Sequence, residues 1–284
     1  MVDKLDHSKN NLVQDKYRLE GKVVIITGGA GLLGIQHAKA IAEMGGVPVL
    51  LDVSKQKLLL AEEDIKKVSP NVYSLVVDIT IEQELQTACE KIISEFEKID
   101  VLINNAAINP KVEEETKTNF SRLENYSLDN WNKELNVGLT GAFLCSKIFG
   151  SSMAINNSGI IINISSDLGI IAPNQNLYRK DGVNADQQSV KPVSYSVIKH
   201  GLIGLTRYLA TYWAEQGVRC NALALGGVFN QQDEQFVKKI SELIPMRRMA
   251  NLDEYKSAIV FLASDASSYM NGSVLTIDGG RSCW

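Results

Sequence analysis

The sequence predicts an α/β protein in which helices flank a doubly wound parallel sheet. Short, continuously apolar segments alternate with longer amphipathic segments along the 284 residues, and the first apolar segment leads into a glycine-rich turn. Continuous rather than alternating apolar residues are typical of parallel strands that are buried on both faces. Neither an internal repeat nor a low-complexity linker divides the chain, so we expect a polar arm at 1–18 and a single domain at 19–284.

Seven apolar segments fit the strands of such a sheet. They cover residues 22–27, 47–52, 72–80, 101–107, 159–166, 218–226 and 273–280. Helical patterns lie between them, at 33–44, 58–68, 82–98, 131–154, after Tyr195, and at 253–265. In the helix after Tyr195, apolar residues recur at spacings of four and three from Ile198 to Tyr212, which makes one apolar stripe.

Three polar segments interrupt this alternation, near 109–129, 178–192 and 230–244. Each of them follows the C-terminal end of a predicted strand. Open α/β sheets bind their ligands at that edge, so we expect these insertions to shape a pocket.

The composition excludes several classes of function. The net charge is −4, from 29 basic and 33 acidic residues, which does not give the basic surface of a nucleic-acid-binding protein. The four cysteines lie far apart and the three histidines form no cluster, so we expect reduced thiols and no metal site. The start of the chain is too polar for a signal peptide, and no apolar run approaches the ~18 residues of a membrane span. We therefore expect a cytoplasmic protein that binds neither membranes nor nucleic acids.

The glycine turn has the spacing of a dinucleotide-binding loop. In TGGAGLLG, residues 27–34, the pattern Gly29-x-Gly31-x-x-Gly34 lies between a strand and a helix, where bare backbone can approach a pyrophosphate. Asp52 ends the second strand, where an acid would bind the ribose hydroxyls of NAD and repel the 2′-phosphate of NADP. The loop has no Arg or Lys, so we expect NAD rather than NADP. Taken alone, the glycines also fit a steric turn, and Asp52 also fits a helix cap.

Tyr195 and Lys199 are four residues apart at the start of a predicted helix, so both project from one face. A lysine ammonium beside a phenol lowers the phenol pKa from about 10, which lets it exchange a proton near neutral pH. An isolated pair of this kind would be a core tyrosine and a surface lysine.

Further motifs accompany this pair in a fixed order: Asp78, NNAA, LNVG around Asn136, NISS ending in Ser166, and then YSVIK. From about residue 19 onward the set resembles the short-chain dehydrogenase/reductase family, and NALALGGV, IPMRRMA and VLTIDGG resemble its nicotinamide loop, lid end and last strand. The most similar branch contains gluconate 5-dehydrogenase-like enzymes and dehydrogenases of surface-sugar or flagellin modification. The resemblance implies a Rossmann-type fold, NAD-dependent interconversion of a secondary alcohol and a ketone, and a homotetramer or homodimer.

The resemblance also implies roles for single residues. Tyr195 would be the general acid/base at the substrate oxygen, Lys199 would hold the nicotinamide ribose and lower the tyrosine's pKa, and Ser166 would orient the substrate oxygen. Asn136 would anchor a water that links Lys199 to solvent. The implied cofactor contacts are Gly28, Gly29, Gly31, Leu32, Leu33, Gly34, Asp52, Val53, Asp78, Ile79, Asn105, Ala106, Ala107, Tyr195, Lys199, Gly226 and Val228.

Two positions depart from the family pattern. Leu32 stands where the commonest form, TGxxxGxG, has a glycine, so the loop instead fits the TGxxGxxG of extended members that act on nucleotide sugars. Those members usually carry a longer C-terminal substrate domain, whereas this chain stops at Trp284, straight after a family-typical last strand. Leu225 replaces the usual proline before Gly226 and changes the expected shape of the nicotinamide loop, where Val228 would still offer its backbone N–H.

The segment between Ser166 and Tyr195 is longer than in most family members. We expect it to overhang a polar substrate such as a sugar, a sugar phosphate or a sugar acid, although an ordered surface loop or a subunit contact explains it equally. The candidate recognition residues are Tyr178, Arg179, Lys180, Asn184, Gln187 and Lys191. Two other functions stay open: a nucleotide-sugar epimerase or dehydratase that retains NAD, and a non-catalytic dinucleotide-binding redox sensor, which would typically have lost the Tyr or Lys.

Overall fold

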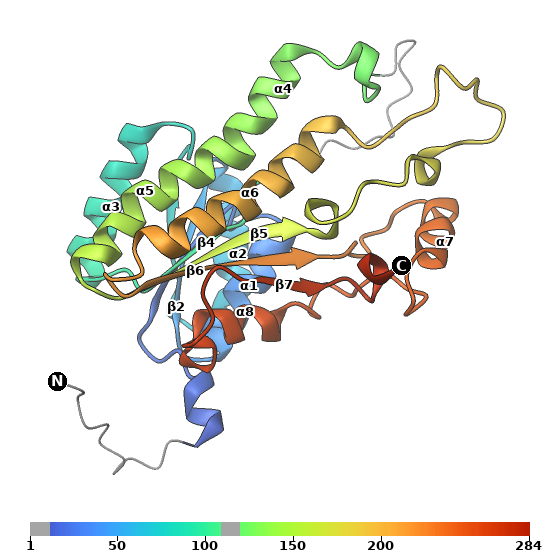
Figure 1. Ribbon diagram of the computed structural model, residues 1–284. Coiled ribbons are helices and arrows are strands. Elements are labelled where there is room, and N and C mark those ends of the chain that lie inside the picture. Colours follow the sequence, from blue (N-terminus) through green and yellow to red (C-terminus); the bar gives the residue numbers. More distant parts are fainter. Residues whose placement is uncertain (1–11, 109–119) are drawn as a thin grey trace.

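The computed structural model describes residues 12–108 and 120–284 of the chain. In these residues seven parallel strands form one sheet, in the order β3-β2-β1-β4-β5-β6-β7, with helices on both faces (Figure 1). The predicted doubly wound α/β fold is thereby confirmed. The strands are β1 (Val23–Thr27), β2 (Val47–Asp52), β3 (Tyr73–Val76), β4 (Val101–Asn104), β5 (Gly159–Ser166), β6 (Val218–Leu225) and β7 (Val274–Ile277).

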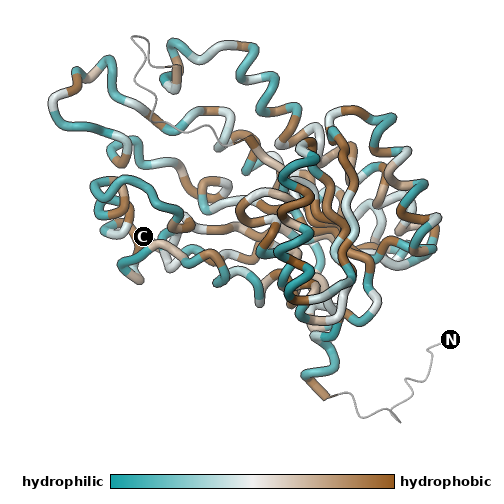
Figure 2. Tube along the Cα trace, turned by 180° about the vertical axis from the view of Figure 1, so that it is seen from behind, coloured by the Kyte–Doolittle hydropathy of each residue, from teal (hydrophilic) through white to brown (hydrophobic). Residues whose placement is uncertain are grey.

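Two apolar clusters, one on each face of the sheet, form the core. Successive β1 residues alternate between them: Val24 and Ile26 pack toward α1, α2 and α8, whereas Val23 and Ile25 pack toward α3, α5 and α6. Every residue of β1 and β5 is buried, which explains their unbroken apolar sequences. Figure 2 shows the same layering, with a hydrophobic sheet inside more polar helices. The helices are α1 (Leu32–Glu43), α2 (Lys55–Lys66), α3 (Glu82–Phe96), α4 (Leu128–Leu135), α5 (Gly141–Ile155), α6 (Val193–Tyr212), α7 (Glu234–Glu242) and α8 (Lys256–Ala263).

Helices α4 and α5 are joined by a π-helical turn at Asn136–Thr140, so the helical path runs from residue 128 to residue 155. By length and composition this path could cross a membrane, a feature that the search for apolar runs overlooked. Cys145, Phe149 and Met153 of α5 instead pack on the sheet. The apolar residues of α5 are therefore explained by its packing in the core of this domain.

Two of the predicted insertions come together beyond the C-terminal edge of the sheet (Figure 1). The segment 230–244 was predicted as a polar insertion without an assigned helix, and most of it forms α7, whose N-terminus is capped by the Asp233 carboxylate. The helix packs on a 3₁₀ turn at Gln175–Tyr178 and forms a small apolar cluster, separate from the core, that we call the entrance cluster. Its members are Leu177, Tyr178, Phe236, Val237, Ile240, Leu243, Ile244 and Met249.

Element ends differ slightly from the predictions. Strand β3 ends at Val76 and β4 at Asn104, because the residues that follow turn away to line the sheet edge. Part of the polar arm is ordered: residues 13–17 form a 3₁₀ turn whose Tyr17 ring lies 6.4 Å from that of Phe261 in α8. The rest of the predicted arm, 1–11, and of the first insertion, 109–119, lies outside the described residues.

Candidate active site

A cleft of about 1690 Å³ opens along the C-terminal ends of the strands. Typical small-ligand pockets measure about 300–1,000 Å³. The cleft therefore has room for a ligand as long as a dinucleotide beside a second small molecule. Every residue predicted for catalysis or cofactor binding lines it except Gly29 and Gly34, and of the six candidate recognition residues all but Asn184 and Gln187 line it.

The glycine turn between β1 and α1 brings backbone to the surface of the cleft. Gly28 has φ +60°, and a Cβ there would lie 2.9 Å from the Cα of Ala106. Gly34 is packed on the turn itself, since a Cβ on it would lie 2.3 Å from the Gly28 carbonyl oxygen. Gly29 is enclosed in the same way by Leu50. Gly29 and Gly34 thus shape the turn from behind and do not line the cleft, while their part in cofactor binding stays a prediction.

Asp52, the last residue of β2, and Asp78, two residues after the end of β3, both line the cleft. The Asp52 carboxylate accepts the backbone N–H groups of Ala30, at 3.3 Å, and Ser54, at 3.1 Å, which fixes its orientation beside the glycine turn. Asp78 accepts the N–H and the hydroxyl of Thr80. Lys57, in the first turn of α2, also lines this end of the cleft. Sequence reasoning searched only the glycine loop for a cation and missed it.

The loop after β4 is bound to β1 through Asn105 and Thr27. The Thr27 hydroxyl accepts the backbone N–H groups of Asn105, at 3.0 Å, and Ala106, at 3.1 Å, while the Asn105 amide donates to the carbonyls of Thr27 and Gly28. The Asn105 side chain therefore holds the cleft wall in place. Its neighbour Asn104 is buried and donates to Ser146 and Asn163, so it has a structural role.

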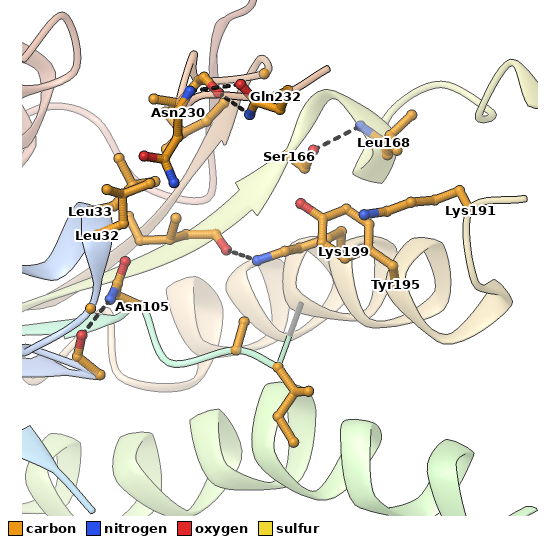
Figure 3. A pocket seen from close by; sticks show the side chains of 18 of the residues that line it. Leu32, Leu33, Asn105, Ser166, Leu168, Lys191, Tyr195, Lys199, Asn230 and Gln232 are labelled. Atoms are coloured by element: carbon orange, nitrogen blue, oxygen red, sulfur yellow. Dashed lines mark hydrogen bonds between the residues drawn. The ribbon is translucent and has the colours of Figure 1, made fainter. Parts of the chain in front are cut away.

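The predicted catalytic residues meet in the cleft from three elements (Figure 3). Ser166 ends β5, Tyr195 and Lys199 lie in the first two turns of α6, and Asn136 begins the π-helical turn. The Lys199 ammonium donates to the Ile164 carbonyl at 2.7 Å and lies 5.6 Å from the centre of the Tyr195 ring.

Burial dominates the proton equilibria of this group. It lowers the pKa of Lys199 to about 8, and the positive charge of Lys191 acts in the same direction. Burial raises the pKa of Tyr195, the hydrogen bond with Ser166 opposes this, and the charge of Asp167 adds to it. The sequence predicted a lowered pKa for Tyr195. The structure raises it instead, because a Tyr195 phenolate would be buried away from water and close to the Asp167 carboxylate. The Tyr195 phenol therefore holds its proton more tightly than a free tyrosine does.

Ser165 and Ser166 are adjacent but face different partners. Ser165 donates to the Lys199 carbonyl at 2.8 Å and so joins β5 to α6, which agrees with a hydroxyl turned away from the substrate. Ser166 donates to Asp167 Oδ1 at 2.8 Å and accepts the N–H of Leu168. The Ser166 hydroxyl can rotate, so the same hydrogen can instead be donated to another oxygen in the cleft.

Two groups at the site were missed by sequence reasoning, Asp167 and Arg281. They form a buried ion pair, Nη1 to Oδ2 2.7 Å, between residues 114 positions apart in the chain. Arg281 begins the 3₁₀ turn Arg281–Cys283, which is connected to Ser166 through Asp167. Lys191 was named only as one of several candidates, yet its ammonium lies 3.7 Å from the centre of the Tyr195 ring.

These residues fit a nicotinamide dinucleotide. The Gly28 turn leaves bare backbone where a pyrophosphate would lie, and the fixed Asp52 carboxylate lies where a ribose would follow. Tyr195 and Lys199 line the same continuous cleft. In the described residues no cluster of three or more His, Cys, Asp or Glu side chains could hold a metal ion.

Comparison with known proteins identifies the family. A family model described as "Enoyl-(Acyl carrier protein) reductase" matches residues 30–282, nearly the whole chain. The chain belongs to the short-chain dehydrogenase/reductase family. Three relatives in that family illustrate its range. The chain is 31% identical to a 3-oxoacyl-[acyl-carrier-protein] reductase of Thermotoga maritima, over 93% of this chain and 98% of the relative.

The other two relatives match the branch predicted from sequence. A 2-dehydro-3-deoxy-D-gluconate 5-dehydrogenase of Bacillus subtilis is 29% identical over 94% of this chain and 97% of its own. Post-translational flagellin modification protein A of Campylobacter coli is 28% identical over 92% and 98%. The predicted likeness to gluconate 5-dehydrogenase-like and flagellin-modification members of the short-chain dehydrogenase/reductase family is therefore confirmed.

Solved structures agree with this assignment. A gluconate 5-dehydrogenase of Burkholderia cenocepacia in complex with NADP and tartrate superposes with a TM-score of 0.83, at 25% identity, over 96% of this chain and all of the other. A xylitol dehydrogenase with bound NAD⁺ gives 0.80 at 26% identity, over 92% and 99%. Members with either dinucleotide thus share the fold of this short-chain dehydrogenase/reductase.

Proposed function

We propose that this short-chain dehydrogenase/reductase interconverts a secondary alcohol and a ketone on a polar, sugar-like or sugar-acid substrate, with NAD(H) as its cofactor and Tyr195 as general acid/base. One observation carries the proposal. Ser166, Tyr195 and Lys199 lie in the cleft that also contains the glycine turn and Asp52, so a substrate oxygen and a dinucleotide can be bound side by side. When bound, the nicotinamide supplies the hydride or accepts it.

The chain's own residues supply position and proton transfer. Tyr195, with its raised pKa, gives its proton to the substrate oxygen during reduction and takes it back during oxidation. Ser166 fixes that oxygen beside the phenol. Lys199, held by the Ile164 carbonyl, places a positive charge next to the forming phenolate and can bind ribose hydroxyls. Asn136 lines the cleft at the π-helical turn, where it can bind a water between Lys199 and solvent.

A polar substrate is supported by the residues that line the outer cleft. They include Arg179, Lys180, Asn230, Gln231 and Gln232 rather than a continuous apolar wall. Relatives named as D-threitol, galactitol and 2-dehydro-3-deoxy-D-gluconate dehydrogenases act on compounds of that kind. This favours a polyol or sugar acid over the acyl chain of the reductase relatives.

The preference for NAD rests on Asp52. Its carboxylate is fixed by two backbone N–H groups at the place where a 2′-phosphate would come, and the two charges would repel. Among the described residues at this end of the cleft, exposed Lys57 is the one cation that could instead attract a 2′-phosphate and favour NADP. An exposed ammonium contributes little beside a fixed carboxylate.

A spectrophotometric assay tests the function. Purified protein is offered NAD or NADP with polyols, sugar acids, sugar phosphates and nucleotide sugars, and reduced nicotinamide is followed by its absorbance. We expect turnover with NAD that is lost in Tyr195→Phe and kept in Tyr269→Phe, because Tyr269 is fully exposed outside the cleft. Turnover that survives Tyr195→Phe contradicts the mechanism. Tightly retained NAD without net absorbance change points instead to the epimerase or dehydratase.

Assembly and location are part of the same proposal. We propose a homotetramer or homodimer in the cytoplasm. Exposed Phe143 on α5 and Tyr208 on α6 give neighbouring helices an apolar outer surface that a second subunit could cover. Light scattering on the purified protein measures the subunit number directly, and a monomer contradicts this part.

A further inference from the structure

The loop that follows β6 begins beside the proposed catalytic centre. Leu225, the last residue of β6, pairs with Ser166 of β5, whereas Asp52 ends β2, three places away in the strand order. A dinucleotide with one ribose at Asp52 and its reacting ring near Tyr195 would therefore end close to this loop. Most of the loop lines the cleft, namely residues 226–228 and 230–233.

The Gln232 side chain closes this loop on itself (Figure 3). Its Nε2 donates to the Val228 carbonyl at 2.8 Å, and its Oε1 accepts the backbone N–H of Asn230 at 2.7 Å. One amide thus bonds a carbonyl and the N–H two residues further on, which is the pattern that a residue of a neighbouring parallel strand makes. A single side chain therefore fixes two backbone groups of the loop.

The sequence of the loop gives it little stiffness of its own. Gly226 and Gly227 are adjacent, and residues 225–232 include no proline, so the backbone has wide conformational freedom. Gln231 has φ +56°, in the left-handed region that residues other than glycine rarely adopt. Bonds on both sides hold this conformation: those of Gln232, and those of the Asp233 carboxylate with the first N–H groups of α7.

Val228 offers a backbone N–H on the side of the loop that Gln232 bonds. On the opposite side the loop pairs with Ala250, because the Phe229 N–H donates to the Ala250 carbonyl at 2.9 Å and the Ala250 N–H donates to the Gly227 carbonyl at 3.0 Å. Successive N–H groups of an extended segment point in opposite directions, so the Val228 N–H points away from Ala250. Among the described residues it has no acceptor, and a ligand oxygen in the cleft would supply one.

We propose that Gln232 is a positioning residue for the nicotinamide ring. By fixing Val228 and Asn230, it directs the Val228 N–H to the oxygen of the ring's carboxamide and the Asn230 side chain to its amino group. This rests on the proposed function. Figure 3 shows the Asn230 side chain pointing away from Gln232 into the cleft. The carboxamide has one acceptor oxygen and one donor amino group, which complement an N–H and an amide oxygen.

The closed loop also explains why such a contact would be useful for hydride transfer. Because the Gln232 amide already holds the loop, binding of the ring requires little further ordering of the chain. A carboxamide held there keeps the ring from turning, so that one face of it stays toward the substrate carbon beside Tyr195 and Ser166.

Calorimetric titration with NADH and with ADP-ribose tests the proposal without requiring turnover. ADP-ribose has the adenosine, the pyrophosphate and the second ribose but lacks the nicotinamide, so the ratio of the two dissociation constants measures what the ring adds. In Gln232→Met, which keeps the length of the side chain and loses both hydrogen bonds, NADH should bind about two- to tenfold more weakly, the range of one neutral hydrogen bond. The affinity for ADP-ribose should stay within about twofold of the wild type.

Two more variants assign the effect to the Gln232 amide. Gln232→Glu keeps an acceptor for the Asn230 N–H but turns a carboxylate oxygen toward the Val228 carbonyl, so it should lose at least as much affinity for NADH as Gln232→Met. Gln83→Met removes an exposed amide from α3, outside the cleft, and should bind both ligands as the wild type does. Binding of ADP-ribose shows in the same titration that each variant is folded.

The outcomes separate this proposal from the function it rests on. If the wild type binds NADH no more tightly than ADP-ribose, or if both Gln232 variants keep the wild-type ratio, the proposal is overturned while binding of a dinucleotide stands. Variants that lose ADP-ribose as strongly as NADH overturn it too, because Gln232 would then support the domain and not the nicotinamide. If the wild type binds neither ligand, the proposed dehydrogenase itself fails and this proposal falls with it.

Discussion

Removal of Arg281 should destabilise the fold and disturb Ser166, because both residues bond the Asp167 carboxylate. The Arg281 and Asp167 side chains are 7% and 3% exposed, and Nη1 lies 2.7 Å from Oδ2. In Arg281→Met the carboxylate stays buried, and the donors left to it among the described residues are the Ser166 hydroxyl and the Leu168 N–H. Breaking a buried pair from one side costs about 3–5 kcal/mol. We expect a loss of that size in the free energy of unfolding.

Urea unfolding at a fixed protein concentration measures this loss. Arg248→Met, which breaks an ion pair with Glu254 whose side chains are 46% and 35% exposed, is the matched control and should cost about 0–1 kcal/mol. Adding Asp167→Asn to Arg281→Met should restore part of the loss, because the uncompensated charge is removed. A loss in Arg281→Met no larger than in the control would refute the reasoning.

Three further predictions concern catalysis and cofactor binding. The rate of ketone reduction should fall as the pH rises through about 8, because Lys199, whose pKa is lowered to about 8, loses its positive charge there. The rate of alcohol oxidation should rise with pH, because it needs the Tyr195 phenolate as a base and the raised pKa of Tyr195 keeps that phenolate scarce at neutral pH. A flat pH–rate profile contradicts both. Gly34→Ala should weaken NADH binding at least about tenfold by fluorescence titration, because its Cβ would lie 2.3 Å from the Gly28 carbonyl oxygen; unchanged affinity would mean that the turn tolerates a shift. Asp52→Ser should lower kcat/KM for NAD by about ten- to a hundredfold and raise that for NADP, and an unchanged ratio would show that another group selects the cofactor.

Sequence reasoning reached the parts of the site that lie close together in the chain. Tyr195 and Lys199 sit one helical turn apart and Asp52 ends an apolar strand, so their place in the site could be predicted from spacing, whereas Ser166 was assigned through the resemblance to the family. The parallel sheet and its helical layers followed from the alternation of strands and helices, whereas the order of the strands was not predicted. What spacing and alternation predicted depends on local periodicity, which a single sequence carries.

What could not be predicted depends on long-range contacts and burial. The Arg281–Asp167 pair joins residues 114 positions apart, and nothing local marks either one as a partner. Helix α7 was missed because its apolar residues stand among charges and find their packing only on the Gln175–Tyr178 turn. The direction of the Tyr195 pKa was wrong since it reflects desolvation in the folded site, whereas the sequence shows only the nearby lysine.

The entrance cluster has a consequence for how ligands come and go. Tyr178 packs its ring 5.7 Å from that of Phe236, and Lys239 of α7 donates to the Arg179 carbonyl, so α7 and the start of the insertion are joined to each other. Because this cluster is separate from the two core clusters, its contacts can break while the sheet stays folded. Backbone amides of α7 should therefore exchange with deuterium much faster than those of β5, and bound substrate should slow them selectively. Substrate entry would then depend on a small local opening, whose rate can be tuned by Phe236 without altering the chemistry below it.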